Sequence, residues 1–157
     1  MKDFYVPKAS GPIVEMGNHR GYVNVRSETT VGGFSMSHVQ VDADGGVPPH
    51  IHRREDEAFY VLEGLFEFIV GADAFIAGPD DTVVGPRDVM HTWRCISPEG
   101  GRVLIFFTPG ANMEAFAFGF AQKVSEFAVA GPAAMAAFAA QYGIEMLPPH
   151  FETLPSQ

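Results

Sequence analysis

The chain has 157 residues, which is the size of a single domain. Its 19 Asp and Glu residues outnumber its 10 Lys and Arg residues, and the net charge of −9 argues against binding to nucleic acid or to an anionic membrane surface. Hydrophobic residues make up 46% of the chain, while 17 Gly and 12 Pro residues favour a turn-rich β domain over a helical bundle. The single cysteine, Cys95, excludes an internal disulfide. Because no N-terminal signal segment is visible, we expect a cytoplasmic protein.

Short strands separated by turn signals are predicted between about residues 22 and 108, at the spacing typical of a β-sandwich or barrel. The expected segments are 21–26, 34–39, 57–62, 65–70, 74–77, 81–84, 91–96 and 102–108. Residues 42–49, which are rich in Asp, Gly and Pro, indicate a loop. In the second segment Phe34, Met36 and His38 share one face, which we expect to point into the barrel, with His38 lining a pocket or hydrogen-bonded in the wall.

Two helices are predicted after residue 110. An apolar stripe recurs at helical intervals in the first, at Met113, Phe116, Phe120, Val124 and Phe127. The second helix begins at Pro132, carries its own apolar stripe at Met135, Phe138 and Tyr142, and ends at Gly143, and an extended tail follows. We therefore divide the chain into a β-barrel domain, residues 1–110, and a C-terminal helical segment with its tail, residues 111–157. The stripes are expected to pack on the outside of the barrel; a lid over a pocket and a dimer contact are the alternatives.

The segment PPHIHRREDE carries the most informative pattern in the chain. His50 and His52 lie two residues apart on an extended segment, so their side chains point to the same side, about 6.6 Å apart at Cα, and can converge on one metal ion. Glu57 would face the wrong way on a continuous strand, so residues 53–56 must form a turn that re-aims it inward. We interpret this charged run as a solvated turn. His91, on a separate strand, completes a ligand set suited to iron, manganese, nickel, copper or zinc.

These residues resemble the two motifs of the cupin family. The spacing of the first motif is matched by His50-x-His52, by Glu57 after four further residues and by Gly64 after six more. Residues 86–91, PRDVMH, resemble the second motif. The flanking sequence is similar to that of single-domain, quercetin dioxygenase-like cupins.

The resemblance covers about residues 30–110 and departs from the family pattern in several places, one of which is the Gly before the first motif, because Gly45 and Gly46 lie closer to His50 than the family's Gly does. Asp80 and Asp88 stand where the family has Gly, and Cys95 stands where it has Asn. The resemblance implies an all-β fold, the double-stranded β-helix or jelly roll of the cupin barrel, here with a short C-terminal helical extension. It also implies one divalent metal ion held inside the barrel by His50, His52, Glu57 and His91. We expect a homodimer, because the aromatic stripes of the two helices exceed what a small barrel needs to cover and because cupins of this size are often dimers.

The predicted barrel interior is rich in aromatic side chains, which favours a small apolar or aromatic substrate, although any barrel interior must be filled by apolar groups. The candidate pocket residues are Met36, His38, Phe59, Phe66, Phe68, Trp93, Cys95 and Phe107. His19 and His150 are expected at the surface.

The leading hypothesis is a metal-dependent cupin of dioxygenase type that acts on a small organic molecule, with Glu57 as both metal ligand and catalytic base. One alternative is a cupin that binds a metal or a small molecule without catalysis. Another is a zinc-dependent isomerase or hydrolase, and a third is an interaction domain whose histidine cluster holds no metal.

Overall fold

The computed structural model describes residues 5–8 and 10–148, and strands dominate this part of the chain. The strands are β1 (Ile13–Glu15), β2 (His19–Val25), β3 (Ser35–Val41), β4 (Gly46–His52), β5 (Asp56–Glu63), β6 (Phe66–Val70), β7 (Asp73–Ala77), β8 (Thr82–Gly85), β9 (His91–Cys95), β10 (Gly101–Thr108) and β11 (Ile144–Met146). The helices are the 3-10 helix η1 (Ser27–Thr30), α1 (Ala111–Ala130) and α2 (Pro132–Gln141).

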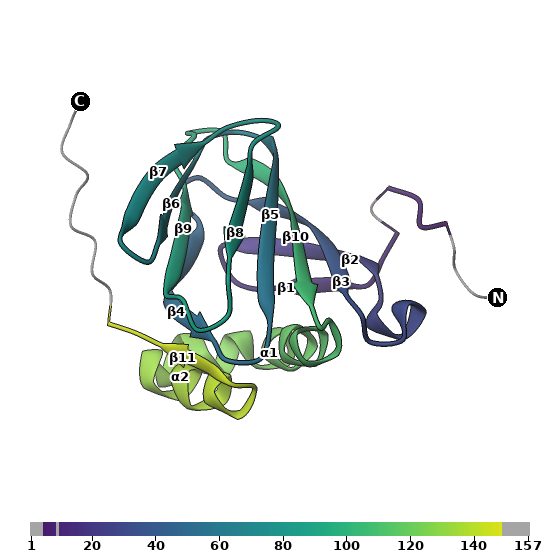
Figure 1. The fold of residues 1–157 in the computed structure, drawn as a ribbon. Helices are drawn as coiled ribbons and strands as arrows, with labels where there is room; N and C mark the ends of the chain where they lie inside the picture. Colours follow the sequence, from purple (N-terminus) through teal and green to yellow (C-terminus); the bar gives the residue numbers. More distant parts are fainter. Residues whose placement is uncertain (1–4, 9, 149–157) are drawn as a thin grey trace.

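The strands form two antiparallel sheets that enclose the core (Figure 1). One sheet has the order β1-β2-β3-β10-β5-β8 and the other has the order β11-β4-β9-β6-β7. This arrangement confirms the predicted all-β jelly roll with a helical C-terminal part. The predicted loop at 42–49 is shorter than expected, because Gly46 and Val47 already pair with Arg94 and Trp93 in the second sheet.

The core lies between the inner faces of the two sheets. Phe59, Phe66 and Phe68 are each at most 1% exposed. Their rings meet edge-on or tilted, with Phe59 and Phe68 centroids 5.1 Å apart and the Trp93 ring packed on Phe59 at 6.2 Å. Burying each such ring contributes roughly 2–3 kcal/mol. This packed layer holds β5, β6 and β9 in fixed relative positions, and two of these strands carry functional residues.

The inner face of β3 is not the one expected. Val39 and Val41 are 4% and 5% exposed and belong to the core, so Met36 and His38 lie on the opposite, outer face. There His38 is half-buried and its ring stacks on Tyr22 of the neighbouring strand. The two buried valines decide the parity of this strand.

Two turns use aspartate where the cupin pattern has glycine. Asp80 and Asp88 have φ values of 72° and 64°, a left-handed conformation that Asp adopts more readily than most residues. The turn around Asp88 is also bonded to the end of β4, because the backbone N–H of Asp88 donates to the carbonyl of His52 at 2.8 Å. Asp88 therefore occupies the left-handed position in the turn that leads from β8 to His91.

The two predicted helices are present as α1 and α2, and they cross one end of the barrel (Figure 1). The segment after them is more than an extended tail, because β11 pairs with β4, with Ile144 opposite His52 and Met146 opposite His50. Residues 149–157, which include His150, lie outside the described residues. Among the residues described, no helix is long and apolar enough to cross a membrane.

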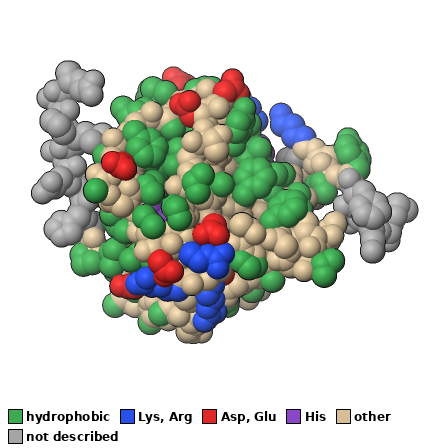
Figure 2. All heavy atoms as spheres, in the orientation of Figure 1, with side chains coloured by type: hydrophobic (Ala, Val, Ile, Leu, Met, Phe, Trp, Pro, Cys, Tyr) green, Lys and Arg blue, Asp and Glu red, His purple; other side chains and the backbone are tan. Residues whose placement is uncertain are grey.

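Charged side chains gather near the edge where the helices meet the barrel, as a band of blue and red in Figure 2. At this end Arg53 pairs with Asp88 and Glu145 at 2.9 and 2.6 Å, and Arg87 pairs with Asp56 at 2.8 Å. These pairs link the turns after β4 and β8 to β11. Because they are exposed, they orient these turns more than they stabilise the fold.

Candidate metal centre

Three strands place the four predicted ligands at one point inside the barrel. His50 and His52 come from β4, Glu57 from the start of β5 and His91 from the start of β9. All four are at most 4% exposed. His50 lies opposite His91 in the β4–β9 pairing, and the turn at residues 53–55 brings Glu57 to the same side. The structure thus brings together the whole set that the motif spacing predicts.

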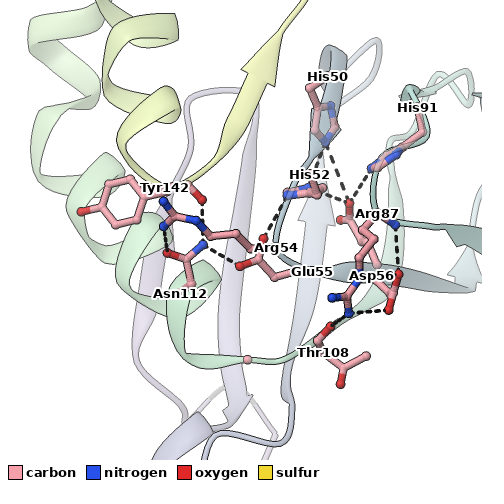
Figure 3. A network of polar contacts seen from close by, with 12 residues as sticks. His50, His52, Arg54, Glu55, Asp56, Arg87, His91, Thr108, Asn112 and Tyr142 are labelled. Atoms are coloured by element: carbon pink, nitrogen blue, oxygen red, sulfur yellow. Dashed lines mark hydrogen bonds and ion pairs between the residues drawn. The ribbon is translucent and has the colours of Figure 1, made fainter.

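The potential ligand atoms of these residues all lie within 4.8 Å of one another. The Nε2 atoms of His50 and His52 are 3.2 Å apart, and Glu57 Oε2 lies 3.2 Å from His52 Nε2 and 2.9 Å from His91 Nε2. Adjacent ligand atoms bound at 2.0–2.2 Å to one ion are themselves separated by ~3.0–3.5 Å. The three distances lie close to that range, while His50 Nε2 and Glu57 Oε2 are 3.9 Å apart. Figure 3 shows the three imidazoles pointing toward one another.

Backbone carbonyls orient two of the imidazoles. His50 Nδ1 lies 2.9 Å from the carbonyl of Pro48, and His91 Nδ1 lies 3.0 Å from the carbonyl of Val89. A carbonyl only accepts, so each Nδ1 carries the hydrogen and donates, which leaves a lone pair on each Nε2. Gly85 leaves room for the His91 ring, since a Cβ at residue 85 would lie 3.0 Å from three atoms of that ring. This orientation is the one that metal-binding imidazoles use.

The third imidazole, that of His52, faces the carboxylate of Glu55, a residue that was predicted to lie in a solvated turn. Glu55 is only 1% exposed, and its Oε2 lies 3.7 Å from His52 Nδ1. Both atoms are buried and lack a hydrogen-bond partner. If His52 Nε2 binds a cation, Nδ1 carries the hydrogen and points at this carboxylate. The interpretation of residues 53–56 as a fully solvated turn is therefore wrong for Glu55, because the C-terminal segment covers it.

The electrostatics of the cluster favour a positive charge. Burial raises the pKa of Glu57, but the surrounding imidazoles of His50, His52 and His91 outweigh burial and hold the pKa well below its usual range. Burial lowers the pKa of His50. For His52, burial also lowers the pKa, but the carboxylates of Glu55 and Glu57 outweigh it and raise the pKa to about 9. Three imidazoles around an ionised, buried carboxylate therefore fit a divalent cation in donor type, distance and charge.

A hydrogen-bond network joins this cluster to the helical segment (Figure 3). Asn112, in the first turn of α1, donates from Nδ2 to Glu55 Oε1 at 2.6 Å and to the carbonyl of Tyr142 at 2.8 Å. Arg54 Nη1 donates to Asn112 Oδ1 at 3.1 Å. One amide side chain thus connects the turn after β4, the start of α1 and the end of α2. The support for His52 therefore depends on the docking of the helices.

A cavity of about 320 Å³ lies between the cluster and the helices. His50, His52 and Glu57 form part of its wall, and Val39, Trp93, Ile105 and Phe107 line the barrel side. The opposite wall is formed by Met113, Phe116, Ala117, Phe120, Met135, Ala139, Ile144 and Met146. Of the three roles considered for the helical stripes, the structure therefore supports covering a pocket.

The residues predicted to line the pocket fall into three groups. Trp93 and Phe107 line the cavity. Phe59, Phe66, Phe68 and Cys95 are buried in the core beneath it, at 0–1% exposure, and are not among its lining residues. Met36 and His38 lie on the outer face of β3, away from the cavity, because the core valines set the parity of that strand.

Polar residues at the start of β2 also belong to the site, although the sequence did not predict this. His19 was expected at the surface, but it lines the cavity with Asn18, and its ring meets Trp93 edge-on at 5.5 Å. Ser37 of β3 also lines the cavity. His19 shares its face of β2 with Gly21 and Val23, which are buried, and this two-residue period could have predicted that His19 points inward.

Part of the chain matches a known protein family. The family model Cupin_2, described as a cupin domain, matches residues 37–107. The chain contains a cupin domain. No curated protein sequence matches the chain.

Solved structures share the cupin fold at low sequence identity. KdgF from Halomonas sp. is 20% identical, with a TM-score of 0.62 over 70% of this chain and 96% of that one. An RmlC-like cupin from Shewanella frigidimarina NCIMB 400 is 20% identical, with a TM-score of 0.59 over 68% of this chain and 91% of that one. The polyketide cyclase RemF from Streptomyces resistomycificus is 18% identical, with a TM-score of 0.57 over 67% of this chain and 78% of that one. At these identities the likeness shows the fold alone.

Proposed function

We propose that this cupin is a metal-dependent enzyme of dioxygenase type that acts on a small, aromatic or otherwise largely apolar molecule. The observation that carries the proposal is the position of His50, His52 and Glu57 in the wall of a 320 Å³ cavity whose other walls are mostly apolar. A purely structural metal site is closed on all sides by protein ligands, whereas a catalytic site keeps a position open to a cavity. The arrangement here supports the second kind.

His50, His52, Glu57 and His91 would hold the ion, and a divalent metal there supplies Lewis acidity and, if it is redox-active, electrons for dioxygen. The protein's own groups have separate tasks. Glu57 is proposed to accept a proton from the substrate as well as to bind the metal. Trp93 and Phe107 are proposed to contact the apolar part of the substrate, and the helical wall to exclude water from the reacting groups.

Elemental analysis of the purified protein, beside a His52→Ala/His91→Ala double variant, tests the metal site. Near-stoichiometric iron, manganese, nickel or copper that the variant lacks, together with oxygen uptake on flavonols, other diphenols or diketones, would support the proposal. Stoichiometric zinc would instead favour an isomerase or hydrolase. Absence of metal after reconstitution would leave a binding or interaction module. Loss of turnover in Glu57→Gln with its metal retained would support the base role, and unchanged turnover would remove it.

A homodimer also remains a prediction. The aromatic stripes that suggested it pack within the helical segment, where the Phe116 and Phe138 rings are 5.8 Å apart and Phe120 and Phe127 are 5.1 Å apart. The expectation therefore rests on the cupin resemblance. Light scattering at micromolar concentration tests it, and a monomer would contradict it.

A further inference from the structure

The cavity has a second polar region besides the predicted metal ligands. Among the described residues that line it, the polar side chains outside the ligand cluster are Asn18, His19, Ser37 and the Trp93 indole. His19 is held against the Trp93 ring, with the two ring centroids 5.5 Å apart and the planes at 64°. Trp93 follows His91 by two residues on β9, so both point to the same face, about 6.6 Å apart at Cα. His19, Trp93 and most of the ligand cluster thus belong to the wall of one cavity.

The hydrogen bonds of Asn18 determine which nitrogen of His19 carries the hydrogen. Asn18 Nδ2 donates to the carbonyl of Gly46 at 3.1 Å, which directs Oδ1 toward His19. This oxygen lies 2.7 Å from His19 Nδ1 and can only accept. The hydrogen of a neutral His19 is therefore on Nδ1, and Nε2 keeps a lone pair.

The surroundings keep this imidazole neutral. Burial lowers the pKa of His19 to about 4, although the negative charges of Asp42 and Glu57 act in the opposite direction. At neutral pH the ring is thus a hydrogen-bond acceptor at Nε2, beside an apolar cavity. An apolar ligand without a hydrogen-bond donor would leave this acceptor unsatisfied once it displaced water, which costs binding free energy.

We propose that His19 Nε2 is a recognition point for the ligand of this cavity, and that the ligand is a small, largely apolar molecule with an oxygen group for the metal and a hydroxyl that donates to His19. The second part rests on the proposed function, which supplies the metal. The class meant is a hydroxylated aromatic or alicyclic compound, such as a phenol that also carries a carboxylate or carbonyl. His19 acts here as a specificity-determining residue.

The test compares isosteric ligand pairs, 3- and 4-hydroxybenzoate against 3- and 4-methylbenzoate, by titration calorimetry on the protein loaded with Zn²⁺. The carboxylate is the metal-binding end, and hydroxyl and methyl groups occupy nearly equal space. In at least one pair, His19→Phe should change the ratio of the two dissociation constants against the hydroxy compound by about fivefold. The matched control is His38→Phe, a histidine on the outer face of β3, which should leave the ratio unchanged. Ratios unaltered by His19→Phe in both pairs would overturn the proposal.

A second measurement needs no variant and no metal. Long-range ¹H–¹⁵N spectra of the wild-type protein distinguish the two neutral tautomers of His19, and we expect hydrogen on Nδ1 with an Nε2 resonance that moves when a hydroxybenzoate is added. An Nε2-protonated ring would overturn the assignment even if His19→Phe does not fold. Failure of the protein to retain any metal would instead remove the proposed function, and the tautomer would still decide the role of His19.

Discussion

Replacing Glu55 by Gln tests whether the carboxylate beneath His52 supports the metal centre. Glu55 Oε1 accepts from Asn112 at 2.6 Å, and Oε2 lies 3.7 Å from His52 Nδ1. An amide in this place has one oxygen where the carboxylate has two. It must turn its NH₂ group either toward Asn112 Nδ2 or toward the Nδ1 hydrogen of His52, and both are donors. One of the two contacts is therefore lost whichever way the amide turns.

The size of the effect follows from the two contacts. Hydrogen bonds to charged groups contribute about 1.5–3 kcal/mol, so loss of the Asn112 contact should lower the free energy of unfolding of the metal-free protein by that amount. Loss of the contact to His52 should weaken metal binding by about 10- to 100-fold, the usual range for a residue that orients a metal ligand.

Two measurements on each variant separate these outcomes. Metal affinity is measured by competition with a chelator, and stability by urea unfolding of the metal-free protein. The matched control is Glu99→Gln, which removes the same charge from an exposed position and should change neither quantity. If Glu55→Gln bound metal within twofold of the wild type and unfolded at the same urea concentration, the carboxylate would have no supporting role.

Three further predictions concern the helical segment and the ligand geometry. Phe138 is 9% exposed and packs against Phe116, Phe127 and Tyr142, so Phe138→Ala should lower the free energy of unfolding by about 3–5 kcal/mol in urea experiments; a loss below about 1 kcal/mol would contradict this packing. Burial raises the pKa of Glu114, but hydrogen bonds from Ser27 and Arg26 outweigh it and hold the pKa below 4.5. The wild type should therefore be more stable than Glu114→Gln at pH 7, and this advantage should shrink as the pH falls below 4.5 through the pKa of the folded state; urea unfolding at several pH values checks this, and a constant difference would refute it. Gly85→Ala places a Cβ 3.0 Å from the His91 ring, so it should weaken metal binding by roughly tenfold, whereas an unchanged chelator titration would show that the ring has room to move.

Local patterns in the sequence were sufficient for most of the elements and for the ligand set. Side chains two apart on a strand share a face, so His50 and His52 had to converge wherever the strand lay. The 3–4 residue recurrence of Met113, Phe116 and Phe120 likewise marked a helix before its partners were known.

Which face of a strand points inward was not available from the same patterns. Alternation in β3 separates Met36 and His38 from Ser37 and Val39, but only the packing of the second sheet on this one turns Val39 toward the core. A two-residue period has two equivalent solutions until a second sheet covers one of them.

The sequence by itself determined most of the strands, the two α-helices and the metal-ligand candidates, because these depend on local residue spacing, whereas β1, β11 and the first part of β4 were not predicted. Only the tertiary structure decided the surroundings of the site. Glu55 is buried because Asn112, 57 residues later, and β11 cover its turn. His19 lines the cavity because the start of β2 lies against Trp93, across the barrel. These contacts join segments far apart in the chain, and their energetic gain exists only once both sheets and the helices have packed together.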